Sequence, residues 1–310
     1  MDIEVLSIGE MLVEVMREKV DQPLGMPGIF LGPFPSGAPT IFIDAIARLG
    51  TKSGFIGTVG EDDFGELILN RLKNDGVNTS YVQRLKNYTT GVAFVTYFSD
   101  GTRKFIYHLS RAASGQISLD QVNEGYLSRV KCLHIMGSSL SINENSREAC
   151  YKAAKIVKSY GGKISLDPNL RPELLSVEQI REICKPILSS CEVILPGEEE
   201  AKVLTGMEDI EVACKKLLSY GPKIVVLKRG KEGSVVITAE RKIEVPSFKV
   251  EEVDPTGAGD CFDAGFIVGL LKGWALEKVA RFANAVGALA VTKKGPMEGA
   301  PFIDKVNEIL

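Results

Sequence analysis

Short apolar runs alternate with longer amphipathic segments along most of the chain, and this alternation limits the folds that the chain can adopt. Strand-like runs are IEVLSIG, SGFIGTVG, KCLHIMG, KISLDPN, CEVILPG and KIVVLKRG. Segments with helical periodicity, such as TIFIDAIARLG and FGELILNRLKNDG, separate most of them. Strands that alternate with helices in this way form a mainly parallel sheet with helices on both faces. The sequence therefore predicts a doubly wound α/β fold.

Two stretches break this alternation. MLVEVMRE and GIFLGPF read as two strands without a helix between them, and GVAFVTYFSDGTRKFIYH reads as a hairpin around Asp100 and Gly101. Together they predict a small inserted β-sheet, which we call the lid. We assign residues 11–34 and 88–111 to the lid, and residues 1–10, 35–87 and 112–310 to an α/β core. Apolar positions on the lid would cover a ligand or pair with a second copy, so we expect a homodimer through the lid.

The composition and charge of the chain limit the kinds of molecule that it is expected to bind. The chain has 310 residues, of which 45% are hydrophobic, and this is enough to fill a sizeable core. Its net charge at pH 7 is −3, and its lysines and arginines are scattered. A nucleic-acid groove or a basic membrane-binding face is therefore not expected, and the partners should be small molecules.

The cysteines and the N-terminal segment indicate a cytoplasmic protein. The six cysteines form no CxxC pair and no spacing with histidine that is typical of a zinc site, so we interpret them as core thiols. MDIEVLSIGE leads directly into a strand without a basic leader, and the chain has no run of 18 apolar residues. We therefore expect a cytoplasmic location and no membrane partner.

Polar side chains follow several of the predicted strands. In an open parallel sheet, the ligand crevice lies outside the carboxyl ends of the strands, so these side chains are candidates for one site. The alternative for each is that it caps the following helix. The residues concerned are Glu10, Glu61, Asp62, Asp167, Asn169, Glu198 and Lys228.

A glycine-rich loop, Thr256–Gly259, precedes a predicted helix from about Asp260 to Lys272. The first turn of a helix leaves N–H groups unpaired, and glycine lets an anion reach them, so the loop predicts a phosphate site. The motifs G-x-x-x-x-G-K-[ST] and G-x-G-x-x-G are both absent from the sequence. Their absence argues against a P-loop NTPase and against a Rossmann dehydrogenase.

Asp260 stands next to this predicted phosphate site. A carboxylate beside a phosphate is electrostatically unfavourable unless it has a chemical role. Such a carboxylate can accept the proton of a substrate hydroxyl as that oxygen attacks phosphorus. The alternative is that Asp260 is an acid in the first turn of a helix and interacts only with the helix dipole.

The segment DPTGAGDCFDAGF resembles the second signature of the ribokinase-like, or PfkB, carbohydrate kinases. SGAPTIFIDAIARLG followed by GFIGTVGEDDFG resembles the first signature, and the match runs in the same order from Ile3 to the C-terminus. The resemblance implies an ATP-dependent sugar kinase that uses Mg²⁺, with Asp260 as the base. It also implies that Gly257, Ala258 and Gly259 form a backbone anion hole. The need for a monovalent cation such as K⁺ stays open.

The resemblance extends to nucleotide and metal positions. KRGKEGS looks like the nucleotide-edge turn of the family, which implies that Lys228, Gly230 and Gly233 lie near ATP; the alternative is an ordinary hairpin turn. FANAVGALA resembles the helix beside the adenine, with Asn284 as the candidate contact, and Thr256 joins the nucleotide-binding set. ILPGEEEA resembles the acidic motif linked to magnesium, with Glu200 at its second acidic position, although Gly197 stands where asparagine is usual. A solvated helix start is the alternative for this segment.

On the substrate side, the segments GE, TRKFIYH and SLDPNLRP look most like 2-keto-3-deoxygluconate kinases and then fructokinases. Arg103 and Arg171 would suit a sugar carboxylate through bidentate contacts, although each alone would be an ordinary surface residue. Core or dimer packing is the alternative for the two lid tyrosines. A sugar or nucleotide sensor that kept the fold without catalysis is an alternative to the enzyme. The predicted substrate residues are Glu10, Gly37, Ala38, Tyr88, Arg103, Tyr107, Asp167, Asn169 and Arg171.

Overall fold

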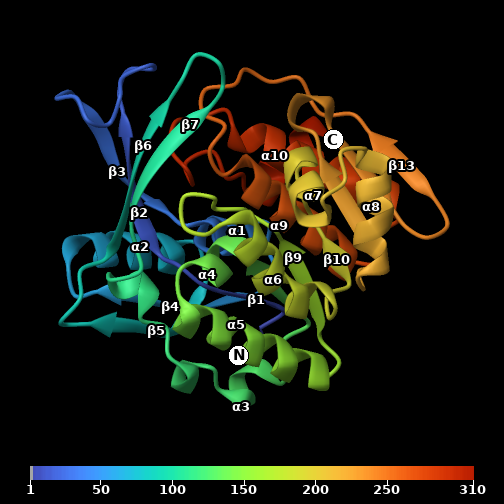
Figure 1. Cartoon of the computed structure of the whole chain (residues 1–310), viewed down its shortest axis with the longest axis horizontal. Coiled ribbons are helices and arrows are strands. Elements are labelled where there is room, and N and C mark those ends of the chain that lie inside the picture. Colours follow the sequence, from blue (N-terminus) through green and yellow to red (C-terminus); the bar gives the residue numbers. More distant parts are fainter. Residues whose placement is uncertain (1–2) are drawn as a thin grey trace.

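A nine-stranded sheet forms the centre of the molecule in the computed structural model, which describes residues 3–310 (Figure 1). The strand order is β13-β12-β11-β10-β9-β8-β1-β4-β5. The strands are β1 (Val5–Ile8), β4 (Ser53–Gly60), β5 (Asn78–Leu85), β8 (Cys132–Met136), β9 (Lys163–Asp167), β10 (Val193–Ile194), β11 (Ile224–Lys228), β12 (Ser234–Ile237) and β13 (Lys242–Val245).

All neighbouring pairs from β5 to β11 are parallel, and β12 and β13 extend one edge as antiparallel strands. Strands β1, β4 and β8 are buried along their whole length. A parallel strand that is covered on both faces has no solvent side, which explains why these segments read as nearly continuous apolar runs. The predicted doubly wound α/β fold is confirmed.

Helices cover both faces of this sheet, as the grouping of their buried side chains shows. One face carries α3 (Glu124–Leu127), α4 (Gly137–Ser141), α5 (Glu144–Ser159), α6 (Val177–Leu188), α7 (Glu198–Thr205) and α8 (Ile210–Ser219). The other carries α1 (Ala38–Arg48), α2 (Asp63–Asn74), α9 (Ala258–Leu271), α10 (Leu276–Ala290) and α11 (Ile303–Ile309). Residues 3–310 also contain three short 3-10 turns, η1 (Ala113–Gly115), η2 (Leu119–Gln121) and η3 (Gly230–Glu232).

Helix α9 is buried over most of its length. It begins at Ala258, two residues before the predicted start, and every residue from Asp260 to Gly269 is buried. Helix α9 packs between α1 and α10 and therefore has almost no solvent face. Two carboxylates, Asp260 and Asp263, are carried into the interior by this helix.

The second sheet is the predicted lid, in the order β3-β2-β6-β7. It projects from one side of the core at the upper left of Figure 1. Its strands are β2 (Leu12–Arg17), β3 (Phe30–Ser36), β6 (Gly91–Tyr97) and β7 (Arg103–His108). Strands β6 and β7 pair antiparallel around the predicted turn, and β2 pairs parallel with β6, which joins the two inserted stretches into one sheet. The segment boundaries 11–34 and 88–111 stay a prediction.

The structure also bears on two expectations from composition. All six cysteines are buried free thiols, as predicted. Across residues 3–310, we find no helix with both the length and the apolar character needed to cross a bilayer.

Candidate active site

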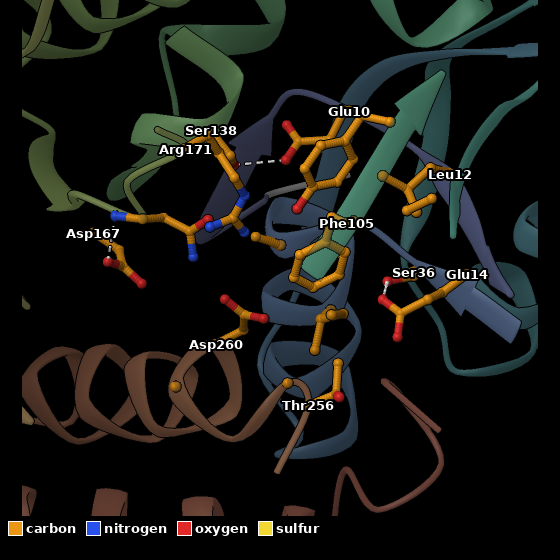
Figure 2. Close-up of a pocket in the computed structure, with 18 of the residues that line it drawn as sticks. Glu10, Leu12, Glu14, Ser36, Phe105, Ser138, Asp167, Arg171, Thr256 and Asp260 are labelled. Atoms are coloured by element: carbon orange, nitrogen blue, oxygen red, sulfur yellow. Dashed lines mark hydrogen bonds between the residues drawn. The ribbon is translucent and has the colours of Figure 1, made fainter. Parts of the chain in front are cut away.

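A cavity of about 270 Å³ lies between the lid sheet and the carboxyl ends of the core strands. We call it the first cavity (Figure 2). Glu10 follows β1, Asp167 ends β9 and Lys228 ends β11, and all three line it. The lid contributes Leu12, Glu14, Arg103, Phe105 and Tyr107. The strand-end residues thus meet at the place where ligands bind in open α/β sheets.

Three of the predicted strand-end residues, Glu61, Asp62 and Glu198, do not line this cavity. Asp62 caps α2 by accepting the Gly65 N–H at 2.8 Å, and it also accepts the Thr90 N–H at 2.7 Å. Glu61 is exposed. The helix-cap alternative is therefore right for Asp62, because its carboxylate is already occupied by backbone N–H groups.

Glycine is required at the start of α9 by the fold itself. Gly257 has φ 78°, and a Cβ there would lie 2.2 Å from the carbonyl oxygen of Pro296. At Gly259, by contrast, a Cβ would lie 3.5 Å from Nζ of Lys228. Gly257 is therefore packed tightly against the backbone of Pro296, and Gly259 leaves room for the ammonium group of Lys228. Gly257 and Gly259 line the first cavity.

Asp260 points from the first turn of α9 into the first cavity (Figure 2). Its residue surface is only 7% exposed. Burial raises the pKa of Asp260 to about 7, and the negative charge of Asp167 acts in the same direction. A carboxyl group with a pKa near neutral pH is well matched to general-base chemistry.

A second cavity of about 540 Å³ lies on the other side of the glycine loop. Lys228, Pro255 and Gly259 line both cavities, so these residues mark their junction. The predicted nucleotide residues Lys228, Gly230, Gly233 and Asn284 line the second cavity, together with Ala258. Thr256 lines the first cavity.

Asn284 has only part of its hydrogen-bonding capacity free for a ligand. Its Nδ2 donates to the carbonyl oxygens of Val245 at 3.0 Å and Pro246 at 3.2 Å. The amide nitrogen therefore holds the chain that follows β13, and this contact was not foreseen. Only Oδ1 of Asn284 is therefore left to contact a nucleotide base directly.

Lys228 is the centre of a buried charge cluster. Its Nζ lies 2.9 Å from Oδ2 of Asp167 and 3.2 Å from each carboxylate oxygen of Asp263. Burial raises the pKa of Asp263, whereas the positive charge of Lys228 helps to lower the pKa of Asp167. Asp263 was not predicted from the sequence. A charged residue inside an otherwise apolar helix was a usable signal, because aspartate is rarely buried unless it is paired.

Glu10 is held in place before any ligand binds. Its two carboxylate oxygens accept hydrogen bonds from the hydroxyls of Ser138 at 2.6 Å and Ser139 at 2.7 Å. Its backbone carbonyl oxygen accepts the Thr40 hydroxyl at 2.9 Å. Burial raises the pKa of Glu10. The two serines were not predicted, because nothing in their local sequence indicates a distant glutamate.

Gly37 and Ala38 both line the first cavity at the start of α1. Gly37 has φ 111°, and a Cβ there would lie 2.5 Å from the carbonyl oxygen of Glu10. Glycine at position 37 thus allows the chain to pass close to the backbone of Glu10. Pro39 then lies in the first turn of α1, where proline is well tolerated.

Glu14 is an acidic residue of the first cavity that was not predicted from the sequence. It lies on lid strand β2 and is 3% exposed. Ser36 donates a hydrogen bond to Oε2 at 3.4 Å, and Oε1 has no partner. Burial raises the pKa of Glu14 to about 7. The usable signal was a glutamate inside a strand whose neighbours are apolar.

Arg103 and Arg171 both line the first cavity. Nη1 of Arg171 donates to the carbonyl oxygen of Leu170 at 3.0 Å, and the guanidinium of Arg103 lies 5.5 Å from the ring centroid of Phe105. Within residues 3–310, neither guanidinium forms an ion pair at 4.0 Å or less. Both cations therefore remain available to a ligand.

Of the remaining predicted substrate residues, some line the first cavity and one does not. Tyr107 and Asn169 line the first cavity, and Asn169 has a left-handed φ of 37° and a buried Oδ1 without a partner. Tyr88 does not line it. Its side chain is 41% exposed, because it lies in the turn between β5 and β6 and not on a lid strand that faces the core. The expected contact between Tyr88 and substrate stays a prediction.

Glu200 lines the first cavity, but its carboxylate already accepts hydrogen bonds from two backbone N–H groups. Oε2 accepts the N–H of Gly197 at 2.7 Å, and Oε1 accepts the N–H of Leu170 at 3.1 Å. The described part of the chain contains no group of three or more histidine, cysteine, aspartate or glutamate side chains that could hold a metal ion. A metal here would take most of its ligands from elsewhere, which is typical of Mg²⁺ bound to phosphates and water.

Comparisons with known proteins agree with this geometry. The model of the pfkB family carbohydrate kinases matches residues 4–303. "Probable fructokinase-5" of Arabidopsis thaliana is 34% identical over 96% of this chain and 94% of its own length. A 5-dehydro-2-deoxygluconokinase of Clostridium perfringens is 28% identical over 99% of this chain and 92% of its own.

A solved structure described as "a putative Ribokinase II in complex with ATP and Mg+2" from E. coli is 42% identical to this chain, with a TM-score of 0.92. The match covers 99% of this chain and 98% of that one. The chain belongs to the pfkB family of carbohydrate kinases, which are phosphotransferases with an alcohol group as acceptor.

Proposed function

We propose that this kinase transfers the γ-phosphoryl group of ATP to a hydroxyl of an acidic sugar, with 2-keto-3-deoxygluconate as the leading candidate. The observation that carries this proposal is that Arg103 and Arg171 line one cavity without an ion-pair partner of their own among residues 3–310. A carboxylate is the natural ligand for a guanidinium, which can bind it through two parallel hydrogen bonds.

In this proposal the sugar occupies the first cavity and ATP the second, with the glycine loop between them. Asp260 accepts the proton of the attacking hydroxyl, a contribution that is typically about 10²–10⁴ in rate. The N–H groups from Gly257 to Asp260 stabilise the charge that develops on the phosphoryl group, by about 3 kcal/mol for each well-placed donor. Lys228 lies at the junction of the cavities and faces the same group.

The nucleotide assignment rests on the residues of the second cavity. Gly230 and Gly233 form the turn beside it, and Gly287 and Ala288 of α10 leave room along one wall. Mg²⁺ bound to the nucleotide would neutralise phosphate charge, and Glu200 would hold it through one of its waters. A monovalent cation near the glycine loop stays a prediction.

Fructose is the second candidate acceptor, because the fructokinase relative is the more similar of the two curated proteins described above. Fructose has no carboxylate, so it would leave both guanidiniums without a counter-charge. The two candidates therefore differ in their dependence on Arg103 and Arg171.

A coupled assay of ADP release tests the proposal on a panel of 2-keto-3-deoxygluconate, fructose, ribose and a nucleoside. We expect the highest kcat/KM for the acidic sugar. A value for fructose that equals or exceeds it would overturn the carboxylate assignment and leave the kinase activity intact.

We also propose a homodimer through the outer face of the lid sheet. Phe105 and Tyr107 face the first cavity, so the alternate residue Ile106 faces outward, where its side chain is 45% exposed. Ile106 pairs with Phe94, whose ring lies 5.6 Å from that of Phe30. We expect light scattering to give twice the chain mass, and Ile106→Asp to give a monomer; a monomeric parent would rule out the dimer.

A further inference from the structure

Asp263 lies one helical turn after Asp260 and does not line either cavity, yet it holds the cation at their junction. We propose that Asp263 is a positioning residue for phosphoryl transfer, which acts by fixing the ammonium group of Lys228 toward the transferring phosphate. The inference rests on the proposed placement of Lys228 beside that phosphate.

The hydrogen-bond count of Lys228 supports this role. A lysine ammonium group has three N–H donors. One is directed to Asp167 at 2.9 Å, and a second is shared by the two oxygens of Asp263, each at 3.2 Å. No other acceptor of Nζ is found among residues 3–310. The third donor is therefore free for an anion.

The surroundings of Lys228 direct this third donor to the junction. Nζ would lie 3.5 Å from a Cβ on Gly259, so the ammonium faces the glycine loop where both cavities meet. The two carboxylates hold it from β9 and from α9, the helix that also carries Asp260. The base and the cation are thus fixed to one another through a single helix.

Asp263 also forms a side-chain hydrogen bond with Asp167, the other carboxylate that holds Lys228. Its other close neighbour is His134, whose Nε2 lies 3.9 Å from Oδ2 and has no hydrogen-bond partner. His134 donates or accepts at Ser165 through Nδ1 at 2.8 Å and stacks on Phe42 at 3.9 Å. Burial lowers the pKa of His134 to about 3, so this ring is neutral and does not replace Lys228 as the counter-charge of Asp263.

A positioning role makes a specific prediction about Asp263 variants. Asp263→Ala leaves Lys228 free to turn toward Asp167 alone, and we expect kcat to fall roughly 10- to 100-fold, the usual range for one charge-assisted hydrogen bond. Asp263→Asn keeps an acceptor oxygen at the same place and should retain kcat within about threefold. Affinity for ADP, which lacks the transferred group, should stay unchanged in both variants.

A double-mutant cycle with Lys228→Met decides whether Asp263 acts through Lys228. If it does, the double variant Lys228→Met, Asp263→Ala has the same kcat as Lys228→Met alone. Losses that multiply would overturn the proposal, as would an Asp263→Asn variant as slow as Asp263→Ala. Should Asp263→Ala fail to fold, Asp263→Ser takes its place in the cycle.

The matched control is Asp44→Asn. Asp44 is also fully buried and paired with an arginine, Arg71 at 3.0 Å, but it lines neither cavity. We expect a lower Tm and an unchanged kcat, which shows the effect of losing a purely structural ion pair. If Lys228→Met keeps the parent kcat, the proposed placement of Lys228 beside phosphate is wrong. If Lys228→Met lowers kcat but the losses of the two single variants multiply in the double variant, that placement stands and the proposed role of Asp263 is wrong.

Discussion

The hydroxyl of Tyr97 on lid strand β6 and the hydroxyl of Thr256 in the glycine loop form a hydrogen bond, although 159 positions separate them in the chain. Thr256 also donates to Oδ1 of Asp254 at 2.6 Å, and Oδ2 of Asp254 accepts the N–H of Gly295 at 2.9 Å. The tip of the lid is thereby connected to the loop that begins α9.

We predict that Tyr97→Phe lowers kcat/KM for the sugar by roughly 3- to 10-fold, the usual effect of losing one neutral hydrogen bond. The reason is that the lid then covers the first cavity without a direct polar contact to the glycine loop. Steady-state kinetics measure the loss. Tyr160→Phe is the control, because Tyr160 is exposed and its hydroxyl bonds to Glu124 away from both cavities. Equal kinetics for the two variants would show that the contact has no role in turnover.

Asp260→Asn should fold and bind ATP but lose turnover by roughly 10³-fold or more, because an amide cannot accept the proton of the attacking hydroxyl. Asp304→Asn is the matched control, since Asp304 is an exposed acid in the first turn of α11. It tests the alternative that an acid at a helix start matters only through the helix dipole. Turnover of Asp260→Asn within tenfold of the parent would remove Asp260 from the base role.

The raised pKa of Asp260 predicts a pH dependence of turnover. A base must be deprotonated to act, and the carboxyl of Asp260 loses its proton at a pH of about 7. We therefore expect kcat/KM, which reports the pKa of the free enzyme, to rise with pH, with its midpoint near pH 7 and a plateau above it. A profile that is flat from pH 5 to pH 8 would contradict a base with this pKa.

Local sequence patterns predicted the parts of the structure that depend on neighbours in the chain. The strands were visible as apolar runs, and the glycine loop with Asp260 was visible as a break before a helix. The lid hairpin was visible from its turn at Asp100 and Gly101. Each of these features is determined within about a dozen residues, which is the range over which periodicity and turn chemistry act.

The parts that were missed depend on pairs that are distant in the chain. Asp263 is paired with Lys228, 35 positions away, and Glu10 with Ser138, 128 positions away. Nothing in the local sequence of either partner indicates the other. The orientation of Tyr88 likewise depends on how the turn after β5 meets the core, which its local sequence does not specify. Local patterns therefore indicated the chemistry of the site more readily than the contacts that hold it in place.

Arg171→Ala distinguishes the two candidate acceptors. If Arg171 binds a sugar carboxylate, the variant should lose roughly 10- to 100-fold in kcat/KM on 2-keto-3-deoxygluconate and much less on fructose. Arg147→Ala is the control, because Arg147 lies on α5, donates to the carbonyl oxygen of Leu140 and does not line the cavity. Equal losses on the two sugars would defeat the carboxylate assignment.

Glu14 predicts a dependence of stability on pH. Burial raises the pKa of its carboxyl from the ordinary 4.5 to about 7 in the folded protein. The folded state therefore binds this proton more tightly than the unfolded state does. The stability that results is fully present below pH 4.5 and is lost as the pH rises through about 7.

Glu14→Gln keeps the shape of the side chain but does not titrate. Between pH 5 and pH 8, the free energy of unfolding of the parent should fall by about 2 to 3 kcal/mol more than that of Glu14→Gln, since each pKa unit corresponds to about 1.4 kcal/mol. Urea unfolding at the two pH values measures this difference, and Glu61→Gln, which changes an exposed glutamate, is the control. Parallel losses of stability in the parent and in Glu14→Gln would mean that the carboxyl of Glu14 is already ionised in the folded protein at pH 5, with its charge balanced by Arg103 across the first cavity.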